Sequence, residues 1–183
     1  MGKAANSCKN TDECKIEYSA LHVWMDNIPY IIMVLLGAYI IGLSFGNYLL
    51  AGAFVLYGIA GTLWFIYFIC PFCHYYGSKA CPCGYGVISK ALIAKKDETR
   101  FHSVFKRNII AIVPIWILPV AAAVYNMINA YSHFMLALTI IFMIDSYVIL
   151  PWISRKYGCV DCPNKEECPW MGSNNKRNKI DNK

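Results

Sequence analysis

The chain has 183 residues, 57% of them hydrophobic, and its formal net charge is +6. A composition so apolar and yet so basic is unusual in a soluble domain of this size. No Asp, Glu, Lys or Arg lies between Asp26 and Lys79. Between Arg107 and Arg155, Asp145 is the one such residue. A bilayer core about 30 Å thick needs about 20 residues of helix, so these regions predict membrane spans rather than buried helices of a soluble protein.

The N-terminal segment, residues 1–27, is polar over its first part and carries Cys8 and Cys14. A cleavable signal peptide needs an apolar core, which this segment lacks, so we expect no signal peptide. We interpret residues 1–27 as a cytoplasmic segment that precedes the first span.

Each charge-poor region is long enough for two spans and contains one short polar turn. The first region divides at "SFGN" and the second at "NAYS". The expected fold is therefore an all-α polytopic membrane protein with two transmembrane hairpins, residues 28–69 and 108–153. The predicted spans are Ile28–Phe45, Tyr48–Ile69, Ile109–Met127 and Phe134–Ile153.

Small residues recur every four positions along the first span and into the turn that follows it, at Ala38, Gly42 and Gly46. Such a stripe lets a second helix pack closely, and the second span contributes Gly58 and Gly61 to the expected contact.

The loop between the hairpins, residues 70–107, begins with "CPFCHYYGSKACPCGYG". Its later part, "GYGVISKALIAKKDETRFHSVFKRN", predicts an amphipathic helix at the membrane interface. The loop contains seven Lys and Arg residues, whereas the two hairpin turns contain none. The positive-inside rule therefore predicts that this loop and both termini are cytoplasmic, in a multi-pass protein of the cell membrane. Because topology accounts for the basic charge, we expect no nucleic-acid partner.

The C-terminal segment, residues 154–183, combines "CVDCPNKEECPW" with a basic tail. All nine cysteines thus fall outside the predicted spans and on the same predicted side, where they would form a cysteine-rich cytoplasmic cap. They are Cys8, Cys14, Cys70, Cys73, Cys81, Cys83, Cys159, Cys162 and Cys168.

Three kinds of site compete for these cysteines. Cys70, Cys73 and His74 match the CxxCH motif of c-type haem attachment, but a cytoplasmic location and the other cysteines argue against haem. Cytoplasmic thiols are kept reduced, which argues against a disulfide framework. Metal binding by thiolates is the interpretation we favour, because paired Cys-x-x-Cys turns bring two sulfurs to one centre.

The predicted ligand sets are two. Cys70, Cys73, Cys81 and Cys83 form one set within a single loop. Cys159, Cys162 and Cys168 form a second, which Cys8 or Cys14 would complete. One or two iron–sulfur clusters are the expected cofactor, with zinc as the alternative and copper-type soft-metal handling as a further one.

Two other residues are candidates for the site. His74 is a possible additional metal ligand, and Asp145 lies within a predicted span, where an ionisable residue suggests proton transfer or ion binding. An ordinary hydrogen bond between helices would account for Asp145 equally well.

These observations predict a membrane-bound iron–sulfur subunit that relays electrons, as part of a larger redox complex, to or from a protein partner or a quinone-like carrier in the bilayer. No residue can be assigned a catalytic role. The alternative is a zinc-stapled membrane scaffold or assembly factor without redox chemistry.

The predicted topology can be tested on Cys81. Because every basic loop is expected on the cytoplasmic side, an impermeant thiol reagent should leave Cys81 unmodified in intact cells and modify it in inverted, chelator-treated vesicles. Modification in intact cells would contradict the topology.

Overall fold

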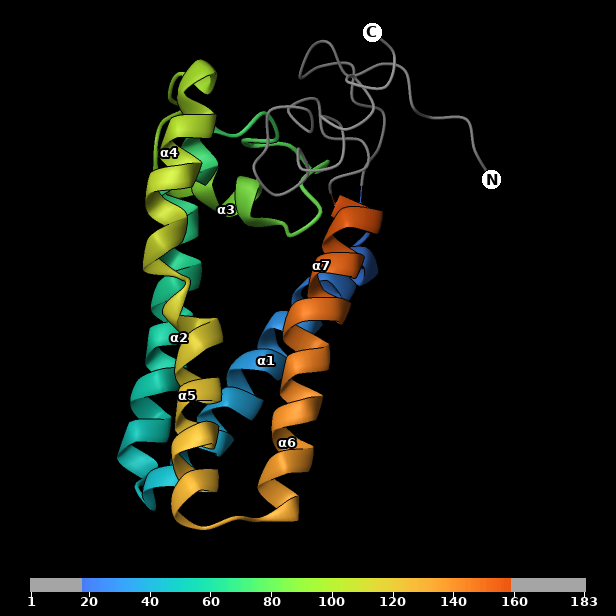
Figure 1. The fold of residues 1–183 in the computed structure, drawn as a ribbon. Coiled ribbons are helices and arrows are strands. Elements are labelled where there is room, and N and C mark those ends of the chain that lie inside the picture. Colours follow the sequence, from blue (N-terminus) through green and yellow to red (C-terminus); the bar gives the residue numbers. More distant parts are fainter. Residues whose placement is uncertain (1–17, 159–183) are drawn as a thin grey trace, which may run out of the picture. The chain divides into compact units, whose positions relative to one another are not determined.

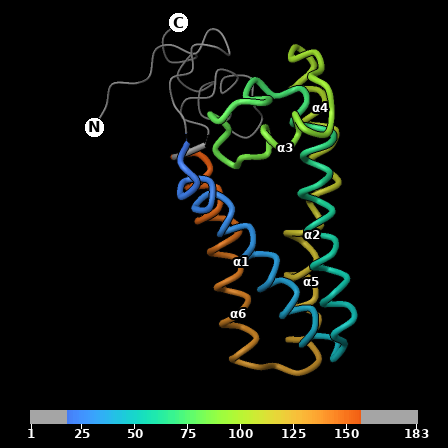
Figure 2. Tube along the Cα trace, turned by 180° about the vertical axis from the view of Figure 1, so that it is seen from behind, coloured from blue at the N-terminus to red at the C-terminus, as the bar shows by residue number. Residues whose placement is uncertain are grey.

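The computed structural model describes residues 18–158, and this part of the chain is helical without a β-strand (Figure 1). Four of its helical stretches are long and apolar enough to cross a membrane: Ala20–Phe45, Tyr48–Phe72, Glu98–Asn129 and His133–Lys156. The predicted class, an all-α protein with four membrane-spanning helices, is confirmed. Figure 2 shows the short turns that join α1 to α2 and α5 to α6.

The first helix, α1 (Ala20–Phe45), begins before the predicted start at Ile28 and includes Asp26. The prediction set this boundary at the last charged residue. A helix can begin before the apolar region does, because its backbone hydrogen bonds form in water as well as in lipid. Residues 20–27 of the predicted N-terminal segment 1–27 are therefore helical and belong to α1.

The second helix, α2 (Tyr48–Phe68), begins after a turn at Gly46 and Asn47, close to the predicted division. Gly46 has a φ of 60°, a left-handed conformation that favours glycine. The Asn47 side chain accepts a hydrogen bond from the Leu49 amide at 2.9 Å. This contact provides a partner for one of the amides that a helix start leaves unpaired.

The predicted single amphipathic helix after the cysteines is divided in two. Helix α3 (Tyr85–Leu92) ends at Ile93, whose backbone is extended. Asp97 then accepts hydrogen bonds from Thr99 at the start of the turn Glu98–Arg100, and α4 (Phe101–Asn108) follows. The third long helical stretch thus begins at Glu98 rather than at the predicted Ile109.

This third stretch is interrupted before α5 (Pro114–Asn129). A short 3₁₀ turn, Ile109–Ala111, separates α4 from α5. Pro114 has no amide hydrogen to donate and clashes with the preceding turn, so a regular helix cannot run through it. The last stretch contains α6 (His133–Ile144), a π-helical segment Asp145–Ile149, α7 (Leu150–Ile153) and a second π-helical segment Ser154–Gly158.

The described residues divide into two compact units, one of residues 18–26, 65–108 and 153–158 and the other of residues 27–64 and 109–152. We call them the loop unit and the span unit. The span unit has close backbone approaches: a Cβ on Gly58 would lie 2.8 Å from Val34 Cγ1, and Tyr30 donates a hydrogen bond to the Gly58 carbonyl at 2.8 Å. The predicted role of Gly58 as a small contact residue agrees with this packing.

Many large apolar side chains of the spans are exposed, among them Leu49, Leu56, Ile117, Ile128 and Val148. In water such a surface would be unfavourable, whereas lipid tails solvate it. The described spans therefore suit a bilayer.

Gly37 offers a test of packing in the span unit. A Cβ there would lie 2.8 Å from both Phe54 Cε1 and Pro119 Cγ, two rigid rings. We expect Gly37→Ala to lower the free energy of unfolding by about 1–3 kcal/mol, as overpacking does. Thermal unfolding in detergent micelles, followed by circular dichroism, measures the change.

Gly52→Ala is the matched control, since no atom lies within 4 Å of a Cβ at Gly52. It should leave the stability unchanged or raise it, because alanine favours helix over glycine. Equal effects of the two substitutions would contradict the packing described here.

Candidate metal centre

The loop between α2 and α3 consists of consecutive tight turns. A 3₁₀ turn, Cys70–Phe72, follows α2, and the Cys73 amide donates to the Cys70 carbonyl at 3.0 Å. Further on, the Cys81 amide donates to Ser78 and the Gly84 amide to Cys81. Backbone hydrogen bonds therefore fix the positions from which the cysteine side chains project.

Two glycines let the loop turn back on itself. Gly77 and Gly84 have φ angles of 73° and 75°, which residues with a Cβ rarely adopt. The Gly77 amide donates to the carbonyl of Gly86 at 3.0 Å and so joins the loop to the start of α3. Gly86 is also closely packed, because a Cβ there would overlap the Tyr75 carbonyl oxygen.

All four cysteines of this loop are thiols rather than disulfides; Cys70 and Cys81 are buried, and Cys73 and Cys83 are partly buried. Cys73 packs against a small core of Tyr75, Ala80 and Cys81. The structure thus gathers the predicted central set into one region of the loop unit.

A thiolate at Cys81 would oppose the loss of a proton from Cys70 and from Cys83. Burial raises the pKa of the Cys83 thiol well above its ordinary value of 9.0, and the nearby Asp26 carboxylate raises it further. Burial also raises the pKa of the Cys81 thiol, although the amide of Gly86, which donates to its sulfur at 3.3 Å, opposes this effect. Without a metal, these thiols stay protonated at neutral pH.

A carboxylate from α1 reaches the same region. The Cys83 thiol donates a hydrogen bond to Asp26 Oδ2 over 2.9 Å, although the two residues are 57 positions apart in sequence. The other carboxylate oxygen, Oδ1, is buried and has no hydrogen-bond partner among the described residues. Asp26 was not among the predicted site residues.

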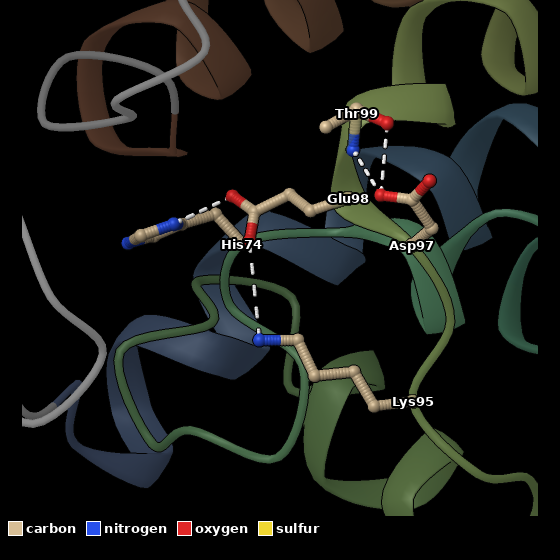
Figure 3. Close-up of polar contacts among 5 residues, drawn as sticks. All are labelled: His74, Lys95, Asp97, Glu98 and Thr99. Carbon is tan, nitrogen blue, oxygen red and sulfur yellow. Dashed lines mark hydrogen bonds and ion pairs between the residues drawn. The ribbon is translucent and has the colours of Figure 1, made fainter.

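His74 is buried and held by a second carboxylate. Its Nδ1 lies 2.7 Å from Glu98 Oε1, and Lys95 Nζ lies 3.9 Å from Glu98 Oε2 (Figure 3). A carboxylate can only accept, so the hydrogen of the imidazole is on Nδ1. The second nitrogen, Nε2, is buried without a hydrogen-bond partner in the described part of the chain. Metal-binding histidines are commonly oriented in this way.

The described residues do not form a finished metal site, because no three of their His, Cys, Asp and Glu side chains are arranged to hold an ion. The predicted four-thiolate set of Cys70, Cys73, Cys81 and Cys83 therefore stays a prediction. The donor chemistry nevertheless fits a thiophilic metal: soft sulfurs lie together in a buried place beside a carboxylate oxygen that lacks a partner. The remaining predicted ligands, Cys8, Cys14, Cys159, Cys162 and Cys168, lie outside the described residues.

Asp145 lies elsewhere, in the span unit, at the start of the π-helical segment. It is 5% exposed, its Oδ2 has no hydrogen-bond partner within residues 18–158, and the same holds for the adjacent Ser146 Oγ. The predicted position of Asp145 within a span agrees with the structure, and its role in proton transfer or ion binding stays a prediction. No other Asp, Glu, Lys or Arg lies in the second apolar region.

Two residues of the site, Asp26 and Glu98, were missed by the sequence analysis. Asp26 had one signal, its place as the last charged residue before the long apolar region. Glu98 had none, because its contact with His74 joins residues 24 apart with no regular spacing.

Comparison of the chain with models of protein families, with curated proteins and with solved structures finds no match. The proposals below therefore depend on the residues of this chain and on their geometry.

The raised thiol pKa values predict how stability depends on pH in the metal-free protein. A folded thiol whose pKa is raised keeps its proton where the unfolded chain has lost it. The contribution of these thiols to the free energy of unfolding is therefore greatest below about pH 8. It decreases as the pH rises from about 8 to 10. Thermal unfolding of the reduced, chelator-treated protein across this range measures the decrease.

The double variant Cys81→Ala, Cys83→Ala is the control, because it removes two of the three thiols whose pKa is raised and leaves Cys70. Its stability should fall less over the same interval. An identical decrease in the variant and the unchanged protein would show that other groups cause the dependence.

Proposed function

We propose that this multi-pass membrane protein binds a thiophilic metal through the cysteines that follow α2, and that it relays electrons through an iron–sulfur cluster held there. The observation that supports the proposal is that the Cys70 and Cys81 thiols are buried, the Cys83 thiol is partly buried, and a thiolate at Cys81 would raise the pKa of the other two. Iron–sulfur clusters are held mainly by such thiolates. The C-terminal cysteines would provide for a second cluster.

The location suits transfer of electrons between the aqueous phase and the bilayer. Cys70 follows the end of α2 almost directly, so a cluster here would lie close in sequence to a membrane span. A quinone-like carrier or another membrane subunit could then exchange electrons with it. We propose that a soluble protein partner exchanges electrons with the cluster from the aqueous phase, as part of a redox complex.

Exposed basic residues favour an acidic partner. Lys79, Lys90, Lys96, Arg100 and Lys106 are all exposed in the loop unit. A positive surface of this kind attracts an acidic redox partner and speeds its association. We further propose that this surface and both termini are cytoplasmic and that the protein resides in the cell membrane, since the positive-inside rule favours that arrangement.

Specific contacts favour a second candidate, a zinc site that staples the loop in a scaffold or assembly factor. Zinc accepts mixed sets of thiolate, imidazole and carboxylate ligands. The His74 imidazole, oriented by Glu98, would supply a ligand of the second type, and the Asp26 carboxylate beside Cys83 would supply one of the third. The two candidates differ in metal, colour and redox activity.

Anaerobic purification followed by iron, sulfide and zinc analysis tests the proposal. Iron and sulfide in equal amounts, with broad visible absorbance that is lost on reduction, are expected for the electron carrier. A colourless protein with zinc alone would overturn electron transfer and support the staple. A protein without either metal would contradict both.

Single substitutions identify the ligands in the same assay. Cys70→Ser, Cys81→Ser and Cys83→Ser should each lower the metal content, because one lost thiolate leaves an open coordination position. Cys73→Ser should lower it as well if the centre takes all four thiolates of the loop. His74→Ala should retain iron if four other ligands suffice and should lose the metal if zinc uses the imidazole. Ser103→Ala, an exposed change in α4, is the control and should keep the full metal content.

A further inference from the structure

We propose that Asp26 is itself a metal ligand, so that the centre takes three thiolates, from Cys70, Cys81 and Cys83, and one carboxylate oxygen from α1. This inference rests on the metal centre proposed above but not on the identity of the metal. It assigns a ligand to a different element of the structure from the cysteine loop and connects metal binding directly to a membrane-spanning helix.

The contact between Asp26 and Cys83 is the first observation. The Cys83 sulfur and Asp26 Oδ2 are 2.9 Å apart, and the thiol hydrogen lies between them. Cys81 and Cys70 both interact electrostatically with the same Cys83 sulfur. The carboxylate therefore belongs to the same group of side chains as the three sulfurs.

The second observation is how poorly Asp26 is paired in the absence of a metal. A thiol is a weak donor, and Oδ1 is enclosed without a hydrogen-bond partner among the described residues. An enclosed carboxylate without strong donors is destabilising, which is why buried charges are normally paired or coordinate metals. A divalent ion would supply the missing positive charge.

The geometry requires only a small rearrangement at this pair. A metal about 2.3 Å from sulfur and about 2.0–2.2 Å from oxygen, with tetrahedral angles, needs its two ligand atoms about 3.5 Å apart. The two atoms, now 2.9 Å apart, would therefore separate by about 0.6–0.8 Å when the ion takes the place of the thiol hydrogen. Each thiol that binds releases its proton to the solvent. Because no three side chains of residues 18–158 are yet arranged around an ion, the other sulfurs must also approach.

The competing interpretation is a purely structural hydrogen bond that attaches the loop to α1. Asparagine separates the two interpretations. In Asp26→Asn, the side-chain oxygen still accepts from the Cys83 thiol, so a structural contact survives. A neutral amide oxygen, however, is a much weaker ligand than a carboxylate.

The experiment uses the full-length protein in detergent micelles, made metal-free under reducing conditions and titrated with Zn²⁺ and with Co²⁺ as a spectroscopic probe. Asp26→Asn should weaken Zn²⁺ binding by more than about 100-fold, beyond the 10–100-fold typical of residues outside the coordination shell. Asp26→Cys should restore binding and raise the sulfur-to-cobalt charge-transfer absorbance in proportion to four thiolates rather than three. Asp97→Asn, at an exposed carboxylate outside the site, should bind as the unchanged protein does.

The outcomes separate this inference from the proposed function. If Asp26→Asn binds Zn²⁺ within about 100-fold of the unchanged protein and its cobalt spectrum is the same, Asp26 is not a ligand, although the metal centre stands. If the unchanged protein binds neither ion and retains no metal when purified, the metal centre and this inference both fall. Circular dichroism verifies that Asp26→Asn is folded, and Asp26→Cys provides the test if it is not.

Discussion

The hydrocarbon core of a bilayer offers no hydrogen-bond partners, and the other features of this chain depend on that constraint. Only helices can satisfy their own backbone there, and a charged side chain is unfavourable at that depth. The described part of the chain accordingly consists of helices, with charge nearly absent from two long regions. Side chains that can bind a metal or exchange a proton are therefore concentrated in the polar segments. Asp26 lies at the boundary of the first apolar region, and Asp145 lies within the second.

This concentration explains how the cysteine loop can be closely packed without a metal. Its backbone is satisfied by consecutive turns, and Gly77 and Gly84 permit the reversals that these turns require. Burial keeps the thiols of Cys81 and Cys83 protonated, and neutral thiols pack like small apolar groups. The same burial means that a metal must displace protons, so metal affinity should depend on pH.

The spans were predictable from the sequence because the absence of charge over some 20 residues has a single physical meaning in a helical protein. The ends of the helices were less predictable. Helix α1 begins at Ala20 rather than at Ile28, and the single helix predicted after the cysteines is divided at Ile93. The grouping of Cys70, Cys81 and Cys83 followed from their closeness in sequence. The contacts of Asp26 with Cys83 and of Glu98 with His74 could not be predicted, since they depend on how distant segments pack.

The charge of the proposed centre gives the basic residues a second role. Three thiolates and one carboxylate around a divalent ion carry a net charge of 2 − 4 = −2, which a partly buried site must offset. The loop of residues 70–107 holds seven Lys and Arg residues against Asp97 and Glu98, a net charge of +5. The proposed cytoplasmic location of this loop would by itself account for the excess. The same positive charge would also stabilise an anionic metal centre in this loop. Each nearby cation lowers the free energy of the charged, metal-bound state relative to the protonated thiols.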